Sequence, residues 1–176
     1  MRILVVGMGL IGGSICKSIK AATSHAVYGC DVQQAVLDDA IADGAIDGTG
    51  TMTDGTYDMI ILCLHQRIAI QMVQEALPKI PAGTILVDTC GLKGRMVRDL
   101  TYRCRKADVR YVGTHPMAGR EKNGYYASIP NLFQNANLIV TPVDGTDEAA
   151  LDAVKELADQ MGFGKIVTAT PMWHDN

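Results

Sequence analysis

The feature that most constrains the fold of this chain is a glycine-rich turn near its N-terminus. The turn reads Gly7-Met8-Gly9-Leu10-Ile11-Gly12 and directly follows the apolar run Ile3–Val6. The residues Ile11, Ile15 and Ile19 then recur with the spacing of one helix face. A G-x-G-x-x-G turn between a strand and a helix is suited to holding the phosphate groups of a dinucleotide. The turn therefore predicts a strand–loop–helix unit with a phosphate site.

The rest of the chain repeats this alternation of strand and helix. Short apolar runs with the length of buried strands occur at Arg2–Val6, Ala26–Cys30, Met59–Leu64, Thr84–Asp88, Val109–Gly113, Leu138–Thr141 and Lys165–Thr168. Segments with helical spacing lie at Ile11–Ile19, Val32–Ala42, Ile68–Leu77 and Leu151–Met161. Runs that are apolar throughout indicate strands buried on both faces. We therefore expect an α/β fold of the Rossmann type, with a doubly wound, mostly parallel sheet and helices on both faces.

Each glycine of the turn has its own expected part in binding. Gly7 allows the tight turn, Gly9 lets the backbone approach a pyrophosphate, and Gly12 lets the helix pack closely on the strand. The helix would then begin near Leu10 and Ile11, where unpaired N–H groups meet the negative charge. We expect all five residues to contact the cofactor.

Asp31 is the expected acidic partner of the turn. It lies 19 residues beyond Gly12 and directly follows the second apolar run. An acid at this place hydrogen-bonds the adenosine ribose, and its charge would repel a 2′-phosphate. Because the following residues, Val32-Gln33-Gln34, carry no cation, the sequence favours NAD over NADP. The alternative is that Asp31 only caps a helix beginning at Val32.

Composition narrows the class of partner. A formal net charge of −3 offers no broad cationic surface, so we expect a small-molecule substrate and neither nucleic acid nor membrane as a partner. The apolar run Met59–Leu64 is far shorter than the ~20 residues that span a bilayer, and the N-terminal run is too short for a signal peptide. We expect a soluble, cytoplasmic protein. Its five cysteines and four histidines show no metal-ligand spacing, so we expect reduced thiols and no metal.

His115 has the richest chemical surroundings of the four histidines. It lies in the segment Gly113-Thr114-His115-Pro116-Met117-Ala118-Gly119, just after the expected strand Val109–Gly113. Ligands of open α/β sheets bind beyond the carboxyl ends of strands, and an imidazole with a pKa near ~6.5 can accept a proton during oxidation of an alcohol. We expect residues 114–137 to form a long functional loop. The alternative is a loop histidine without a catalytic role.

These motifs together resemble the prephenate dehydrogenase family, which includes the arogenate and cyclohexadienyl dehydrogenases of tyrosine biosynthesis. The resemblance covers the whole chain and rests on four segments: Gly7–Ser14, Asp88–Gly94, Gly113–Gly119, and Leu132-Phe133 ahead of Thr141-Pro142. It implies an NAD-dependent oxidative decarboxylation of prephenate to 4-hydroxyphenylpyruvate, or of arogenate to tyrosine.

The resemblance also implies roles for individual residues. His115 would be catalytic and draw off the proton of the ring hydroxyl, with Thr114 and Lys93 beside it at the substrate. Leu64 and Thr89 would contact the cofactor. The family's turn commonly reads Asp-x-Gly-Ser-x-Lys, whereas this chain has Cys90-Gly91 at the third and fourth places, so the serine hydroxyl is lost.

Family members continue into an all-helical domain that forms a dimer and binds the substrate carboxylates. We therefore expect residues 1–170 to form the dinucleotide-binding domain and residues 171–176 to begin the linker to the helical domain, in a full-length parent that is a homodimer. Two alternatives stay open. One is an NAD-binding module without chemistry, and the other is a two-domain dehydrogenase acting on a β-hydroxyacid or an imine.

Overall fold

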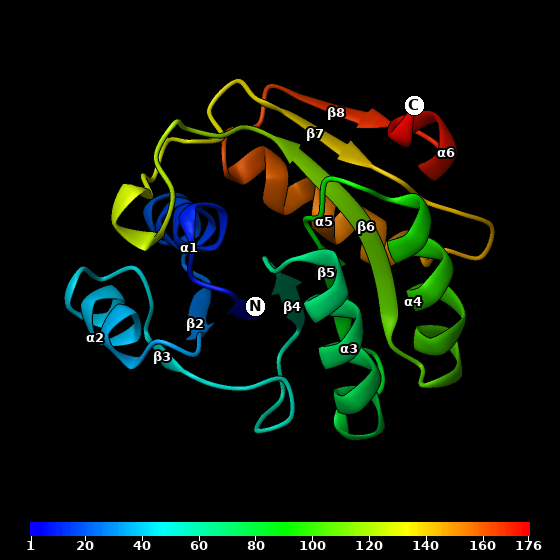
Figure 1. The fold of residues 1–176 in the computed structure, drawn as a ribbon, viewed down its shortest axis with the longest axis horizontal. Coiled ribbons are helices and arrows are strands. Elements are labelled where there is room, and N and C mark those ends of the chain that lie inside the picture. The colour runs from blue at the N-terminus through cyan, green and yellow to red at the C-terminus, as the bar shows by residue number, and fades with distance from the viewer.

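The computed structural model describes residues 1–176 as one eight-stranded sheet between two layers of helices (Figure 1). The strand order is β3-β2-β1-β4-β5-β6-β7-β8. The strands are β1 (Arg2–Val6), β2 (Ala26–Cys30), β3 (Gly48–Thr49), β4 (Met59–Leu62), β5 (Ile85–Asp88), β6 (Arg110–Met117), β7 (Asn137–Val140) and β8 (Lys165–Thr168). The first six are parallel, which confirms the expected α/β fold with a mostly parallel sheet of the Rossmann type.

Helices cover both faces of this sheet. They are α1 (Leu10–Ala22), α2 (Gln34–Ala42), α3 (Gln66–Ala76), α4 (Gly94–Lys106), α5 (Glu148–Gln160) and the short α6 (Pro171–Asp175), with 3-10 turns η1 (Leu77–Lys79) and η2 (Tyr125–Ala127). The core on one face is formed with α1, α2 and α5, and the core on the other face with α3 and α4. The figure shows α6 near the end of β8, beside α4.

Strand β1 shows why these strands are apolar throughout. Ile3 and Val5 belong to the core beneath α1 and α2, whereas Leu4 and Val6 belong to the core beneath α3 and α4. All four side chains are buried, because successive residues of a strand point to opposite faces and both faces are covered.

The strand that carries His115 is longer than the sequence indicates. Strand β6 runs on through Met117, and its last four residues pair with the antiparallel strand β7, with His115 opposite Ile139. The expectation that His115 belongs to a loop is therefore wrong. The irregular segment begins only after Met117, and the cross-strand hydrogen bonds to β7 fix the backbone at His115.

Three further details differ from expectation. Helix α2 begins at Gln34 rather than Val32, with Gln33 as its N-cap. Helix α4 was not identified from the sequence. Strand β8 is parallel to β7, so both run against the other six. None of the helices has the length and apolar character needed to cross a membrane.

Candidate functional site

The glycine turn joins β1 to α1, and the structure separates its three glycines by what surrounds them. Gly7 has a φ of +95°, and a Cβ there would lie 2.3 Å from the carbonyl oxygen of Cys63. A Cβ on Gly12 would lie 1.8 Å from the carbonyl oxygen of Gly7. A Cβ on Gly9 would meet nothing within 4 Å. Gly7 and Gly12 are therefore required by the fold, whereas Gly9 leaves open space above the turn.

Helix α1 presents an uncapped N-terminus at this open space. Its N-cap is Gly9, which has no side chain, and its first turn contains no acidic residue. The N–H groups of the first turn of a helix have no partner within the helix. Leu10 and Ile11, both half-buried, begin this turn, so their backbone can meet an anion.

Asp31 lies at the edge of the turn, directly after β2. Its Oδ2 atom accepts a hydrogen bond of 2.8 Å from the N–H of Met8, and its Oδ1 atom accepts one of 2.9 Å from the N–H of Gln33. The side chain of Val32 is 99% exposed. The carboxylate is thus fixed beside the glycine turn rather than serving as the N-cap of α2.

Leu64 and Thr89 follow the ends of the two central strands, β4 and β5. The Cδ2 atom of Leu64 lies 2.9 Å from the place of a Cβ on Gly7, so this side chain borders the glycine turn. Thr89 donates a hydrogen bond of 3.0 Å from Oγ1 to the carbonyl oxygen of Leu62. Burial raises the pKa of the neighbouring thiols of Cys63 and Cys90 to about 12, so both stay protonated.

A buried polar network lies beneath the turn after β5. Lys93 and Asp88 form an ion pair, and both side chains have no exposed surface. Tyr111 donates a hydrogen bond of 2.6 Å to Oδ1 of Asp88, and Lys93 donates one of 2.7 Å from Nζ to the carbonyl oxygen of Thr114. The hydroxyl of Thr114 donates a bond of 2.6 Å to the carbonyl oxygen of Asp88. This network ties the turn after β5 to the strand that carries His115.

The polar groups of Lys93 and Thr114 therefore point into the protein. Burial, the Asp88 charge and the hydrogen bond to it raise the pKa of Tyr111, so its hydroxyl remains a donor. Contact of Lys93 and Thr114 with substrate stays a prediction, and in this structure the polar atoms of both side chains bond to neighbours inside the fold. This direction cannot be predicted from the sequence, because a lysine beside a glycine turn has the same pattern whether it faces ligand or core.

His115 is half-buried near the carboxyl end of the sheet. Its Nδ1 atom lies 2.8 Å from Nε2 of His174, while a Cβ on Gly91 would lie 3.6 Å from its Nε2 atom. Burial first, then the neighbouring His174 and Lys93, lower the pKa of His115 below its ordinary value, against the opposing effect of Asp88. A neutral imidazole at neutral pH can accept a proton.

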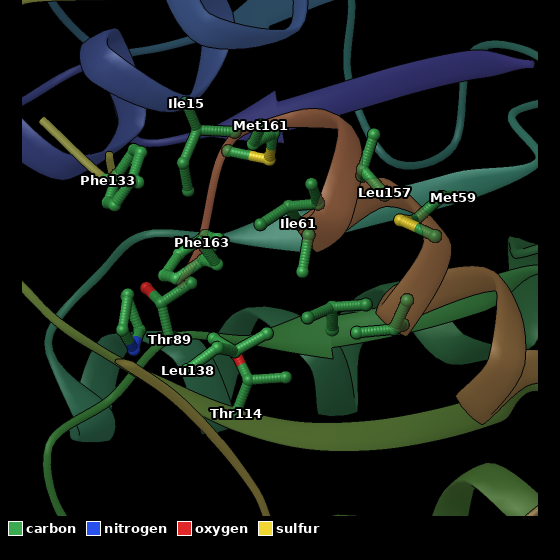
Figure 2. A pocket seen from close by; sticks show the side chains of 14 residues that line it. Ile15, Met59, Ile61, Thr89, Thr114, Phe133, Leu138, Leu157, Met161 and Phe163 are labelled. Atoms are coloured by element: carbon green, nitrogen blue, oxygen red, sulfur yellow. The ribbon is translucent and has the colours of Figure 1, made fainter. Parts of the chain in front are cut away.

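Thr89 and Thr114 also border a small apolar cavity between the sheet and the α1 and α5 layer (Figure 2). The figure shows them with Leu138 and Phe163, opposite Ile15. The cavity measures about 40 Å³. One water needs about 10–15 Å³ on this measure, so the cavity has room for a few waters and is too small for a nicotinamide or a cyclohexadienyl ring. The cavity is therefore a gap in the core rather than a substrate site.

His174 and Asp175 are site residues that sequence reasoning did not single out. They lie in α6, 59 and 60 positions after His115, yet His174 contacts its ring directly. Asp175 accepts hydrogen bonds of 2.8 Å from the N–H groups of both Lys93 and Gly94. The pair was expected only as the start of a linker.

The sheet order and the glycine turn at the start of α1 define a nucleotide-binding domain of the Rossmann type. The family model described as "Prephenate dehydrogenase, nucleotide-binding domain" matches residues 15–168. The chain belongs to the prephenate dehydrogenase family, a family of oxidoreductases.

Comparison with individual proteins agrees with this family. The chain is 31% identical over 144 residues to a prephenate dehydrogenase of Lactococcus lactis subsp. cremoris, a match covering 80% of this chain and 40% of that protein. The solved structure of Synechocystis arogenate dehydrogenase matches with a TM-score of 0.90 and 27% identity. That of a prephenate dehydrogenase from A. aeolicus, in complex with hydroxyphenyl propionate and NAD+, matches with a TM-score of 0.89 and 28% identity. Each match covers 99% of this chain and 62% of the other.

The chain spans 40% to 60% of the length of the curated relatives it matches first. A 3-hydroxyisobutyrate dehydrogenase from Mycobacterium tuberculosis matches with a TM-score of 0.75 at 17% identity, which shows a shared fold alone.

Proposed function

We propose that this chain is the NAD-binding part of a prephenate or arogenate dehydrogenase and that His115 is its catalytic base. The observation that carries the proposal is the position of His115. Its half-buried imidazole lies at the carboxyl end of the sheet, one nitrogen is occupied by His174, and the other faces Gly91. Its lowered pKa keeps the imidazole unprotonated at neutral pH, so it can accept a proton.

The cofactor would be held by the glycine turn and by the strand ends around it. Gly9 leaves room for the pyrophosphate, the N–H groups near Leu10 and Ile11 meet its charge, and Gly7 and Gly12 shape the turn. The carboxylate of Asp31 would bind the adenosine ribose, with Leu64 and Thr89 toward the nicotinamide. When bound, NAD supplies the acceptor for a hydride. The relative solved with NAD+ supports this choice of cofactor.

The chemistry assigned to this chain is removal of one proton. His115 would accept the proton of the ring hydroxyl as the hydride leaves the same carbon of prephenate or arogenate. The ring carboxylate then departs as carbon dioxide, and the electron pair it leaves makes the ring aromatic. Lys93 and Thr114 would hold the backbone of β6, and with it His115, in place for this step through their hydrogen bonds inside the fold, rather than by touching substrate.

The proposal includes a second domain. Residues 1–170 would be the dinucleotide-binding domain, and residues 171–176 would lead into a helical domain that binds the substrate carboxylates and forms a homodimer in the cytoplasm. The small core cavity beside Thr89 and Thr114 is not lined by His115. In this proposal the second domain completes the walls of the site at His115. Met172 and Trp173 are 75% and 66% exposed in α6, as expected for side chains that another domain covers.

Two measurements test this function. Calorimetric titration of the 176-residue chain should show NAD binding. When the helical domain is also supplied, addition of prephenate or arogenate should produce reduced cofactor, which is measured by its absorbance. NAD binding without turnover of either substrate would instead favour a binding module, and turnover of a β-hydroxyacid or an imine alone would favour the other dehydrogenase class.

A further inference from the structure

We infer that His174 and Asp175 act as an orienting pair for His115, so that Nδ1 of His115 carries the proton and Nε2 is the basic nitrogen. The inference deepens the proposed function, because it names the atom through which His115 would accept the substrate proton. His174 and Asp175 are positioning residues in this account and do not touch the reacting atoms.

Three side chains form a continuous hydrogen-bonded row. Nδ1 of His115 lies 2.8 Å from Nε2 of His174, and Nδ1 of His174 lies 2.8 Å from Oδ1 of Asp175. The two imidazole rings meet edge to face, with centroids 5.0 Å apart and an angle of 70° between their planes. The side chain of His174 is only 5% exposed, so water has little access to the middle of the row.

The carboxylate at the end of the row is held in its charged form. Partial burial raises the pKa of Asp175, but hydrogen bonds from the N–H of Lys93, the ring of His174 and the N–H of Gly94 together lower it to about 2. The two backbone donors begin helix α4, and each lies 2.8 Å from a carboxylate oxygen. An ionised carboxylate can only accept hydrogen bonds.

When His174 is neutral, the direction of every proton in the row follows from that charge. Asp175 accepts, so Nδ1 of His174 must donate. A neutral imidazole with its proton on Nδ1 has a lone pair on Nε2, so Nε2 of His174 accepts. His115 must therefore donate from Nδ1, which leaves the lone pair on its Nε2. A Cβ on Gly91 would lie 3.6 Å from that atom.

With His174 neutral, the row also gives the imidazolium that forms when His115 takes a proton an acceptor for its Nδ1–H, the lone pair on Nε2 of His174. Once Nε2 is protonated, the positive charge on His115 is linked through His174 to the Asp175 carboxylate. The other charges that act on His115 come from Asp88, at the end of β5, and from Lys93, in the turn after it. These two residues form an ion pair with each other and have opposite effects on the pKa of His115. Asp88 is the anion that raises the pKa of His115 directly, and Asp175 is the further anion that the row links to His115 through His174.

A charged His174 would reverse this arrangement. It would donate from both nitrogens, so Nδ1 of His115 would accept and the proton of His115 would sit on Nε2. His115 could not then act as a base toward the Gly91 side. The two arrangements differ in one observable, the tautomer of neutral His115.

The experiment reads that tautomer directly. The 176-residue chain, carrying ¹⁵N in its histidine rings, is examined by long-range ¹H–¹⁵N correlation spectra across a pH series. His115→Asn and His174→Phe assign the signals, and exposed His65 serves as an internal reference for a ring without a fixed partner. Neutral His115 should carry its proton on Nδ1. A proton on Nε2 would overturn the inference.

Two variants test whether His174 and Asp175 set the tautomer of His115. Asp175→Ala removes the acceptor that orients His174, and His174→Phe removes the partner of His115 while leaving Asp175 on the N–H groups of α4. Each should shift the tautomer ratio of His115 by about tenfold toward Nε2–H, as loss of one typical hydrogen bond predicts. Asp175→Ala should also lower the pKa of His115, because the anion linked to it through His174 is gone. Asp152→Ala, an exposed carboxylate on α5, is the matched control.

An Nδ1–H form that persists in both variants would show that the pair does not set the tautomer. If a circular-dichroism melt shows that Asp175→Ala does not fold, the spectra of the wild type and of His174→Phe still show which tautomer His115 adopts and whether His174 sets it. None of these readings depends on turnover. Near-normal turnover by His115→Asn, with the helical domain present and neutral wild-type His115 protonated on Nδ1, would overturn the proposed function alone. Loss of turnover in His115→Asn, with neutral wild-type His115 protonated on Nε2, would overturn the inference alone.

Discussion

The carboxylate of Asp31 and the backbone N–H of Met8 are joined by a hydrogen bond of 2.8 Å. This bond links the acidic residue after β2 to the glycine turn after β1, two segments that are adjacent only because their strands pair in parallel. It fixes a negative charge at the edge of the turn, where a 2′-phosphate of NADP would have to lie.

The first prediction concerns the choice of cofactor. The chain should bind NAD at least about fivefold more tightly than NADP, because repulsion between two charges near a protein surface is on the order of 1–4 kcal/mol. Asp31→Ser combined with Val32→Arg should reverse the preference, since the exposed side chain at position 32 is free to carry a cation. Calorimetric titration with both cofactors measures this. Equal affinities in the wild type would remove the assignment of Asp31 to the ribose.

Gly9→Val should abolish NAD binding while the fold survives. The Cβ position at Gly9 is open, so the branched side chain fits the protein but fills the space of the pyrophosphate. Loss of glycine at the N-cap should cost no more than about 1 kcal/mol. Gly12→Ala is the contrast, because its Cβ would lie 1.8 Å from a backbone oxygen and should destabilise the fold itself. A folded Gly9→Val protein that still binds NAD would exclude the phosphate-loop assignment.

Most of the strands could be predicted from the sequence, because residues buried on two faces leave a continuous apolar run. Arg2–Val6 and Ala26–Cys30 agree with the structure to the residue. Lys165–Thr168 also agrees, although this edge strand has no fully buried residue. Strand β6 could not be bounded in this way. Its last part contains Thr114, His115 and Pro116, which give no apolar run, and only the pairing with β7 holds it extended.

The glycine turn was recognisable because its residues are close in sequence and each has a defined geometric task. The pair His174 and Asp175 was not, because its contact with His115 joins segments about 60 residues apart and depends on how α6 lies beside α4. The inward direction of Lys93 was hidden for a similar reason. Its partners, Asp88 and the carbonyl of Thr114, come together only in the folded sheet.

Lys93→Met should destabilise the protein by about 3–5 kcal/mol, because it leaves the Asp88 carboxylate buried without its cation. Urea denaturation gives the free energy of unfolding. Lys20→Met is the matched control, since its ion pair with Asp47 is partly exposed and should contribute less than about 1 kcal/mol. Similar losses in the free energy of unfolding for both variants would show that the buried ion pair contributes no more to stability than the partly exposed one.

Gly91→Ser should lower the pKa of His115 further without disturbing the fold. A Cβ at position 91 would lie 3.6 Å from Nε2, an ordinary contact, and a serine hydroxyl could then donate a hydrogen bond to that nitrogen. A bond to the neutral form lowers the pKa. An NMR titration measures it, with Gly91→Ala as the control for added bulk. An increase in the pKa would mean that Nε2 already carries the proton.

The most direct test of the whole account is turnover by His115→Asn, measured with the helical domain present. Asn keeps a polar group but cannot accept the proton, so turnover should fall by about 10²–10⁴-fold while NAD affinity barely changes. The wild-type enzyme should lose activity only as the pH falls through the lowered pKa of His115, below its ordinary value of 6.5, because the neutral ring is the base. The variant should lack that acid limb. Near-normal turnover with the acid limb unchanged would contradict the account, because the base would then lie elsewhere.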